Sequence, residues 1–165
     1  MKRISVLFLV FFLTGCSSAR LPSAKDVQAY YAQPFSAEIT FALGENTAIC
    51  AFSREGEVYL LTAESPDSLA GLETELSGDA AELRYAGMEK AFPVSALPEK
   101  NPAVLLRAMV SALAAGEFTL VGTEEGASAA GEGFTLYFDA KSLMPAKAVF
   151  PETGLTVRFQ SFAVG

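Results

Sequence analysis

Residues 36–63, SAEITFALGENTAICAFSREGEVYLLTA, give the clearest structural signal in this chain. Apolar and polar residues alternate from Ser36 onward, which is the period of a β-strand with one buried face. The short polar segments GEN and REG that interrupt the pattern are turn signals. We therefore predict three consecutive strands, joined by short turns into an antiparallel meander. Their predicted ranges are 36–43, 47–53 and 57–63.

The third of these strands is apolar on both faces. Val58 and Leu60 point to one side, and Tyr59, Leu61 and Ala63 point to the other. The second strand has the same character. An antiparallel sheet with one solvated face alternates more cleanly than this. We expect these strands to be covered on both sides, by helices or by something that is not part of the chain.

Two helices are predicted to accompany the sheet. Asn101 suits an N-cap, Pro102 the first helical position and Gly116 the end, which predicts a helix over 102–115. A pair of residues suited to capping, Ser23 and Asp26, begins a shorter helix. Further strands are predicted at 72–76, 81–85, 118–121, 133–138, 146–150 and 155–162, with loops at 92–98 and 122–133. About eight strands and two helices in this order indicate an α+β domain with helices on one face of an antiparallel sheet.

The N-terminal residues predict export and lipid attachment. Lys2 and Arg3 precede an apolar run over 4–13, which is the layout of a secretory signal peptide and too short for a membrane span. Leu13-Thr14-Gly15-Cys16 resembles the bacterial lipobox, in which the cysteine receives a diacylglycerol and the chain is cut before it. We predict a signal peptide at 1–15, a lipidated N-terminus and tether at 16–23, and one domain at 24–165.

A lipidated Cys16 would fix the protein's location. Two acyl chains, such as palmitate, give stable anchoring, and the short tether keeps the domain close to the lipid surface. We expect an extracytoplasmic protein on the outer face of the cytoplasmic membrane, or on the outer membrane if the cell has two. Loss of Lys2 and Arg3 leaves ten basic against nineteen acidic residues, a net charge of −9. That charge argues against nucleic acid as a partner.

The sequence contains no histidine, which removes the commonest nucleophilic triads, most zinc sites and the usual general base near neutral pH. Cys50 lies in an apolar stretch without neighbouring positive charge and is interpreted as a structural thiol. We therefore predict no catalytic, cofactor-binding or metal-binding residue. Cys16 is the single predicted site residue.

Several carboxylates and glycines are alternative candidates for a functional site. Glu124-Glu125 could serve acid–base chemistry, but a carboxylate pair before a small-residue segment is typical of a solvated loop. Glu73 and Glu75 indicate the solvated face of their strand. The glycines of 122–133 are not followed by a lysine at P-loop spacing. The apolar face of the 102–115 helix is either core or the lining of a ligand cavity.

The chain resembles the LolA/LppX-like lipoprotein superfamily. The resemblance lies in the order of elements and in three C-terminal stretches, Phe134–Asp139, Leu143–Lys147 and Leu155–Phe159. The chain is similar also to GerS-like germination lipoproteins of spore formers, around Ser65-Pro66 and Leu69–Leu72. The resemblance implies a curved half-barrel sheet with helices on its concave face. LolA-like carriers bind lipoprotein acyl chains in that concavity, whereas other members bind lipids or partner proteins.

Two non-enzymatic functions follow from this resemblance. The first is a membrane-anchored lipoprotein that binds a lipid or acyl chains in the concavity, which predicts an apolar cavity between sheet and helices. The alternative is a protein-partner module that regulates an envelope, cell-wall or spore-germination factor. It predicts a filled interior with an exposed apolar patch or an unpaired sheet edge. A carrier must shuttle, so a fixed Cys16 favours an acceptor, lipid-binding or regulatory role.

Overall fold

The computed structural model describes residues 21–124 and 126–165, and Cys16 and the predicted signal peptide lie outside these ranges. The helices are α1 (Ala24–Tyr31) and α2 (Pro102–Ala115), with a 3₁₀ turn at Val94–Ala96. The strands are β1 (Phe35–Leu43), β2 (Asn46–Glu55), β3 (Val58–Ser65), β4 (Glu73–Ser77), β5 (Ala80–Tyr85), β6 (Met88–Pro93), β7 (Thr119–Thr123), β8 (Gly126–Gly131), β9 (Phe134–Phe138), β10 (Pro145–Phe150) and β11 (Leu155–Val164). Neither helix of the described chain has the length and apolar character needed to cross a bilayer.

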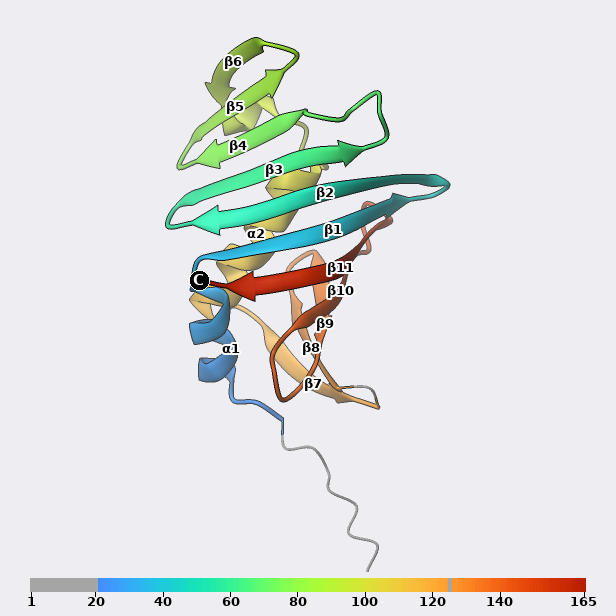
Figure 1. The fold of residues 1–165 in the computed structure, drawn as a ribbon. Helices are drawn as coiled ribbons and strands as arrows, with labels where there is room; N and C mark the ends of the chain where they lie inside the picture. Colours follow the sequence, from blue (N-terminus) through green and yellow to red (C-terminus); the bar gives the residue numbers. More distant parts are fainter. Residues whose placement is uncertain (1–20, 125) are drawn as a thin grey trace, which may run out of the picture.

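All the strands form one open antiparallel sheet in the order β6-β5-β4-β3-β2-β1-β11-β10-β9-β8-β7 (Figure 1). Each half of the sheet is a simple meander, β1 to β6 on one side and β7 to β11 on the other. The two halves meet at the centre, where β1 pairs with β11 from Phe35↔Val164 to Ala42↔Thr156. The first and last strands of the chain therefore hold the sheet together.

The predicted α+β class is confirmed, but the prediction of about eight strands is wrong because the sheet has eleven. The nine strand ranges predicted above each correspond to an observed strand, and two strands were missed. One of them, β6, lies at the sheet edge with nearly every residue exposed, so it has no apolar period to detect. The other, β8, falls inside the predicted 122–133 loop. Its sequence GASAAG is needed for close packing, because a Cβ on Gly126 would meet the carbonyl oxygen of Phe138 and one on Gly131 would meet the Phe134 ring.

The helices begin and end as their sequences predict. The Asn101 side chain accepts a hydrogen bond from the Ala103 amide at 2.9 Å, and Gly116 ends α2 in the left-handed conformation at φ 80°. Such a conformation favours glycine because it has no Cβ. Ser23 and Asp26 form a reciprocal capping box at the start of α1. The meander of β1, β2 and β3 also follows the predicted strands.

Both helices lie on one face of the sheet. α2 contacts β3 and β4 on one arm and β8 on the other, so the sheet curves around it, and α1 packs against α2. In Figure 1, α2 runs behind β1 to β3. We call this helix-covered side the concave face and the opposite side the outer face. The expectation that β2 and β3 are covered on both sides is not met within the described residues, since Ile49 on the outer face is 38% exposed.

The concave face is filled by the protein's own side chains. α1, α2 and the strands contribute to one continuous apolar core. Its largest side chains with less than 2% exposure come from all of these elements: Tyr31, Phe52, Ile39, Leu76, Leu106, Met109, Leu113, Leu136, Val27 and Val157. The apolar face of α2 is therefore core.

Candidate functional site

Two neighbouring strands part near the middle of the sheet. β10 and β11 pair only from Lys147↔Arg158 to Phe150↔Leu155. Beyond Arg158, β11 continues alongside β1, whereas the first residues of β10 stay with β9 through Pro145↔Phe138. The two strands therefore diverge at one end and leave a gap in the sheet.

Helix α1 closes this gap on the concave face. The centre of the Tyr31 ring lies 6.0 Å from that of Phe162 on β11 and 6.5 Å from that of Phe138 on β9, so the ring spans from β11 to the strand that stays paired with β10. Its hydroxyl donates a hydrogen bond to the Leu143 carbonyl at 2.8 Å. Arg54 of β2 donates to the Tyr31 carbonyl, also at 2.8 Å. Burial raises the pKa of Tyr31, so this hydroxyl stays protonated and able to donate.

At the same divergence an open groove of about 780 Å³ remains. We call it the β10–β11 groove. Its apolar lining comes from Ala127, Phe138, Met144, Pro145, Ala146 and Phe159. Its polar lining comes from Thr123, Glu124, Tyr137, Asp139, Lys147 and Arg158. The volume lies within the range of ligand-binding clefts, about 300–1,000 Å³, but the even mixture of polar and apolar groups differs from a purely hydrophobic pocket.

Three side chains of the groove form a single cross-strand row. Tyr137 of β9 is paired with Lys147 of β10, which is paired with Arg158 of β11, so all three point to the outer face. The Lys147 ammonium lies 4.8 Å from the centre of the Tyr137 ring, in a cation–π contact. The ion pairs of the described residues all belong to Arg84, so Lys147 and Arg158 form no ion pair with the groove carboxylates Glu124 and Asp139. This row attracts an anionic group.

The carboxylate of Asp139 at the groove is committed to a turn. It accepts hydrogen bonds from the Ser142 amide at 2.7 Å, from the Ser142 hydroxyl at 2.8 Å and from the Lys141 amide at 3.0 Å. These hydrogen bonds lower the pKa of Asp139 and keep the carboxylate ionised, and the bonds from Ser142 have the largest effect. The bonds shape the β9–β10 connection, so Asp139 positions the groove wall.

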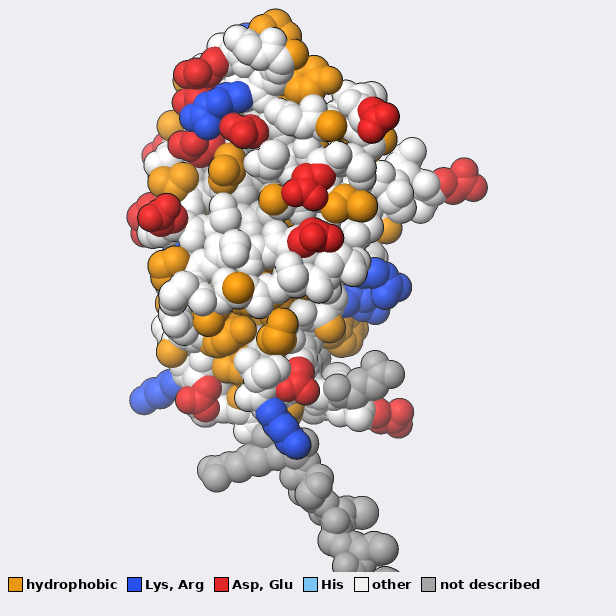
Figure 2. Space-filling view, viewed as in Figure 1, with side chains coloured by type: hydrophobic (Ala, Val, Ile, Leu, Met, Phe, Trp, Pro, Cys, Tyr) orange, Lys and Arg blue, Asp and Glu red, His pale blue; other side chains and the backbone are white. Residues whose placement is uncertain are grey.

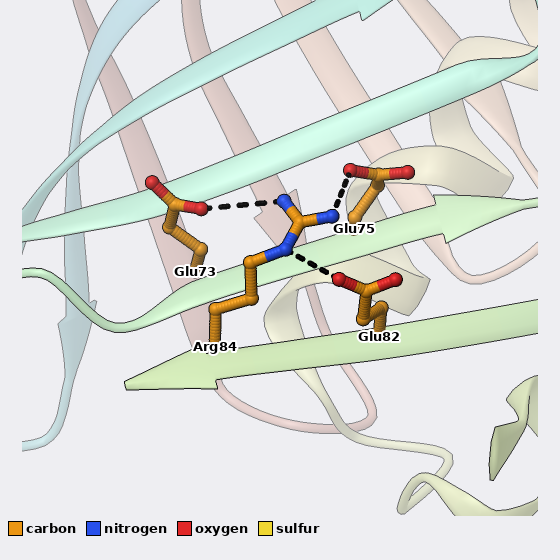
Figure 3. Close-up of polar contacts among 4 residues, drawn as sticks. All are labelled: Glu73, Glu75, Glu82 and Arg84. Carbon is orange, nitrogen blue, oxygen red and sulfur yellow. Dashed lines mark hydrogen bonds and ion pairs between the residues drawn. The ribbon is translucent and has the colours of Figure 1, made fainter. Parts of the chain in front are cut away.

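Glu73 and Glu75 lie on the outer face of β4, as predicted for a solvated strand face. Figure 3 shows them around Arg84 of β5 together with Glu82. Arg84 contacts Glu75 at 3.0 Å, Glu73 at 3.4 Å and Glu82 through its Nε atom. These hydrogen bonds raise the pKa of the Arg84 guanidinium, and the bond to Glu82 has the largest effect. Figure 2 shows basic and acidic side chains together on the outer surface over the β4–β5 part of the sheet, and the Arg84 cluster ties β4 to β5.

The remaining sequence candidates are not brought together. Cys50 is buried. Its burial, and to a smaller extent the nearby charge of Glu64, raises the pKa of the thiol to about 11, so the thiol stays protonated. Glu124 is exposed at the groove, and its predicted partner Glu125 lies outside the described residues. The predicted lipid attachment site, Cys16, also lies outside them.

Sequence reasoning assigned no role to Tyr137, Lys147 or Arg158. All three fall within or beside the C-terminal stretches that carry the family resemblance, at alternating positions of their strands. Alternation shows that each side chain points away from the core. It does not show which residues of different strands lie opposite one another, because that depends on the register.

No protein-family model matches the sequence, and a search of curated proteins finds no match. Solved structures do match. A protein from Thermus thermophilus, described as an uncharacterized conserved protein, matches with a TM-score of 0.56 and 14% identity, over 86% of this chain and 85% of that chain. The chain shares its fold with that protein.

Two further solved structures match with lower TM-scores. A LolA superfamily protein from Nitrosomonas europaea matches with a TM-score of 0.46 and 9% identity, over 87% of this chain and 94% of that one. A chain from the complex of the CwlD amidase of Clostridioides difficile with the GerS lipoprotein matches with a TM-score of 0.39 and 14% identity, over 88% and 95%.

Proposed function

We propose that this protein is a non-enzymatic binding module of the cell envelope, anchored outside the cytoplasm through a lipidated Cys16, that binds a protein partner at the β10–β11 groove. The observation that carries this proposal is the contrast between the two faces of the sheet. The concave face, where a LolA-like carrier would hold acyl chains, is occupied by buried side chains such as Met109 and Leu113 of α2. The open space lies instead where the strands diverge.

The lining of the groove suits a peptide better than an acyl chain. An acyl chain is stabilised in proportion to the apolar area that it buries, and half of this groove is polar. A peptide segment places an apolar side chain and a charged one within a few ångströms of each other. Phe159 and Met144 provide the apolar contact, and Lys147 and Arg158 provide the charge. The expected partner segment therefore carries an acidic residue next to an apolar one.

The candidate chemical groups of the chain support a binding rather than a catalytic role. Glu73 and Glu75 are paired with Arg84, and the Cys50 thiol is buried and protonated. Asp139 accepts its hydrogen bonds within a turn. Each of these groups is thus engaged in holding the fold.

Binding of an amphiphilic lipid is the second candidate function. The observation in its favour is that an apolar floor, with Phe138 and Phe159, lies directly beside two cations. An acyl chain on the floor would place an anionic head group near Lys147 and Arg158. The ligand would then lie at the divergence of the strands, outside the filled concave core.

Native mass spectrometry separates the two candidates. A version of the protein that begins at Ser17, and so lacks the acylated cysteine, is purified from cells without detergent. We expect the mass of the polypeptide alone. A co-purified lipid that disappears in the Lys147→Glu, Arg158→Glu double variant would overturn the protein-partner proposal in favour of the lipid candidate.

Site-specific photocrosslinking in intact cells then tests the partner. A photoreactive residue replaces Tyr137 in the groove or, as the matched control, Thr62 on the outer face of β3. We expect a specific crosslinked protein from position 137 that is absent from position 62 and is lost when Arg158→Glu is added. Identical crosslinks from both positions would contradict a partner site at the groove. A Cys16→Ala variant that still fractionates with membranes would contradict the anchor.

A further inference from the structure

The two outer edges of the sheet differ in how they are protected. Edge strands expose unpaired amide and carbonyl groups, and proteins normally guard them with charged residues or proline. β6 carries Glu89, Lys90 and Pro93, whereas β7 has the sequence TLVGT, with no charged residue and no proline. In the described part of the chain, β7 pairs only with β8. β7 is therefore the unguarded edge.

We infer that β7 accepts an extended, basic segment of a protein partner as an additional antiparallel strand. The inference rests on the proposed partner-binding function and names the form and charge of the segment that is recognised. Strand addition uses main-chain hydrogen bonds for affinity and alternate side chains for specificity. Val121, in the middle of β7, is 50% exposed and offers an apolar contact to such a strand.

The charge of the segment follows from the residues around β7. Glu117 precedes the strand, Glu124 follows it, and Glu132 stands in the turn between β8 and β9. All three are exposed. None of them forms an ion pair with a described residue, since those ion pairs all involve Arg84. The extended part of this segment is β7 itself, Thr119–Thr123, and Glu117 and Glu124 lie just beyond its two ends. A partner strand with a basic residue near each end would match this arrangement.

The same charges argue against a second copy of the chain as the occupant. Antiparallel pairing of two β7 strands about a twofold axis at Val121 would pair position 118 of one copy with Glu124 of the other, so Glu117 and Glu124, which flank the strand in each copy, would gather at both ends of the paired strands. Like charges in neighbouring positions of paired strands are destabilising. The protein's net charge of −7 adds long-range repulsion between copies.

The test uses the full chain in non-ionic detergent and a synthetic probe, the capped peptide acetyl-KTVTVTK-amide. Two versions of this peptide carry backbone N-methyl groups. One version is methylated at the odd-numbered residues, and the other is methylated at the even-numbered residues. An added strand turns only one of these sets toward β7. By fluorescence anisotropy, we expect one methylated set to weaken binding at least tenfold and the other to leave it within about threefold. Equal binding of both methylated peptides would overturn strand addition, because their charges are identical.

Variants of the protein test the charge. We expect the Glu117→Gln, Glu124→Gln double variant to weaken binding of the basic peptide at least threefold. The matched control, Glu99→Gln with Glu152→Gln, removes two exposed acids elsewhere and should leave binding unchanged. If both double variants lose the same peptide affinity, the effect comes from net charge alone, and the predicted site at β7 is overturned. A charge-reversed peptide, acetyl-ETVTVTE-amide, should not bind.

Two further measurements distinguish the alternatives. If sedimentation shows that the wild type is a dimer and that Val121→Lys abolishes the dimer, the occupant of the β7 edge is a second copy of the chain and not a basic segment.

The Lys147→Glu, Arg158→Glu variant should bind the basic peptide at least as tightly as the wild type does, because it leaves β7 unchanged and adds negative charge near Glu124. If the peptide fails to bind while groove crosslinks persist, the β7 inference fails and the proposed groove function stands. If the groove crosslinks are lost while the peptide still binds, the proposed groove function fails and the β7 inference stands.

Discussion

Replacement of Tyr31 by phenylalanine tests whether α1 is held on the diverging strands by its hydroxyl. Tyr31 is 2% exposed, and its hydroxyl donates to the Leu143 carbonyl at 2.8 Å across 112 residues of sequence. Phenylalanine keeps the ring contacts with Phe138 and Phe162 and removes only this hydrogen bond. A typical intramolecular hydrogen bond contributes about 1 kcal/mol to stability. In a domain of this size we therefore expect the melting temperature to fall by about 2–4 °C.

The neighbouring Tyr30 provides the matched control for this substitution. Its ring also packs against Phe162, at 5.9 Å, but its hydroxyl has no hydrogen-bond partner among the described residues. In urea titrations followed by circular dichroism, Tyr30→Phe should change the free energy of unfolding by less than about 0.3 kcal/mol, because it removes no such bond. Amide exchange near Leu143 should accelerate only in Tyr31→Phe. Equal stability of the two variants would refute the role assigned to the Tyr31 hydroxyl.

Three further predictions concern the core, the buried thiol and the surface cluster. Leu113→Ala, at a fully buried position of α2, should lower the free energy of unfolding by about 2–5 kcal/mol in urea titrations, and a loss below 1 kcal/mol would mean that the concave face is not tightly packed. Because burial raises the pKa of Cys50 from 9.0 to about 11, the unfolded state releases its proton first, so stability should fall by roughly 2 kcal/mol between pH 9 and 11. Cys50→Ala should lack this component, and an unchanged alkaline slope in the variant would refute it. Arg84→Gln leaves three carboxylates in close proximity, so its melting temperature should drop more in low salt than in 1 M salt, and a salt-independent change would contradict this electrostatic reason.

The parts of the fold that sequence predicts are those specified by local patterns. Helix α2 was predicted at its observed bounds because Asn101, Pro102 and Gly116 mark both ends within the sequence itself. The first three strands followed from alternation and short turns. β8 escaped detection because its alanines and glycines have low strand propensity, and its pairing depends on room beside Phe134 and Phe138.

The candidate site could not be predicted for a different reason. Tyr137, Lys147 and Arg158 are about ten residues apart along the chain and become neighbours only through the registers of β9, β10 and β11. The divergence that opens the groove depends on β11 following β1 beyond Arg158, which is a long-range choice of partner. Sequence patterns show which residues avoid the core, but the groove arises from how distant segments pair.

The central pairing of β1 with β11 has a consequence for when the protein folds. β11 (Leu155–Val164) is synthesised long after β1 (Phe35–Leu43), so one edge of β1 has no native neighbour until β11 has been made. Closing so long a loop is slow compared with forming the hairpins on either side. A polypeptide that crosses a membrane with its N-terminus leading would thus keep its two halves unjoined during passage. The complete sheet would form only after β11 had emerged.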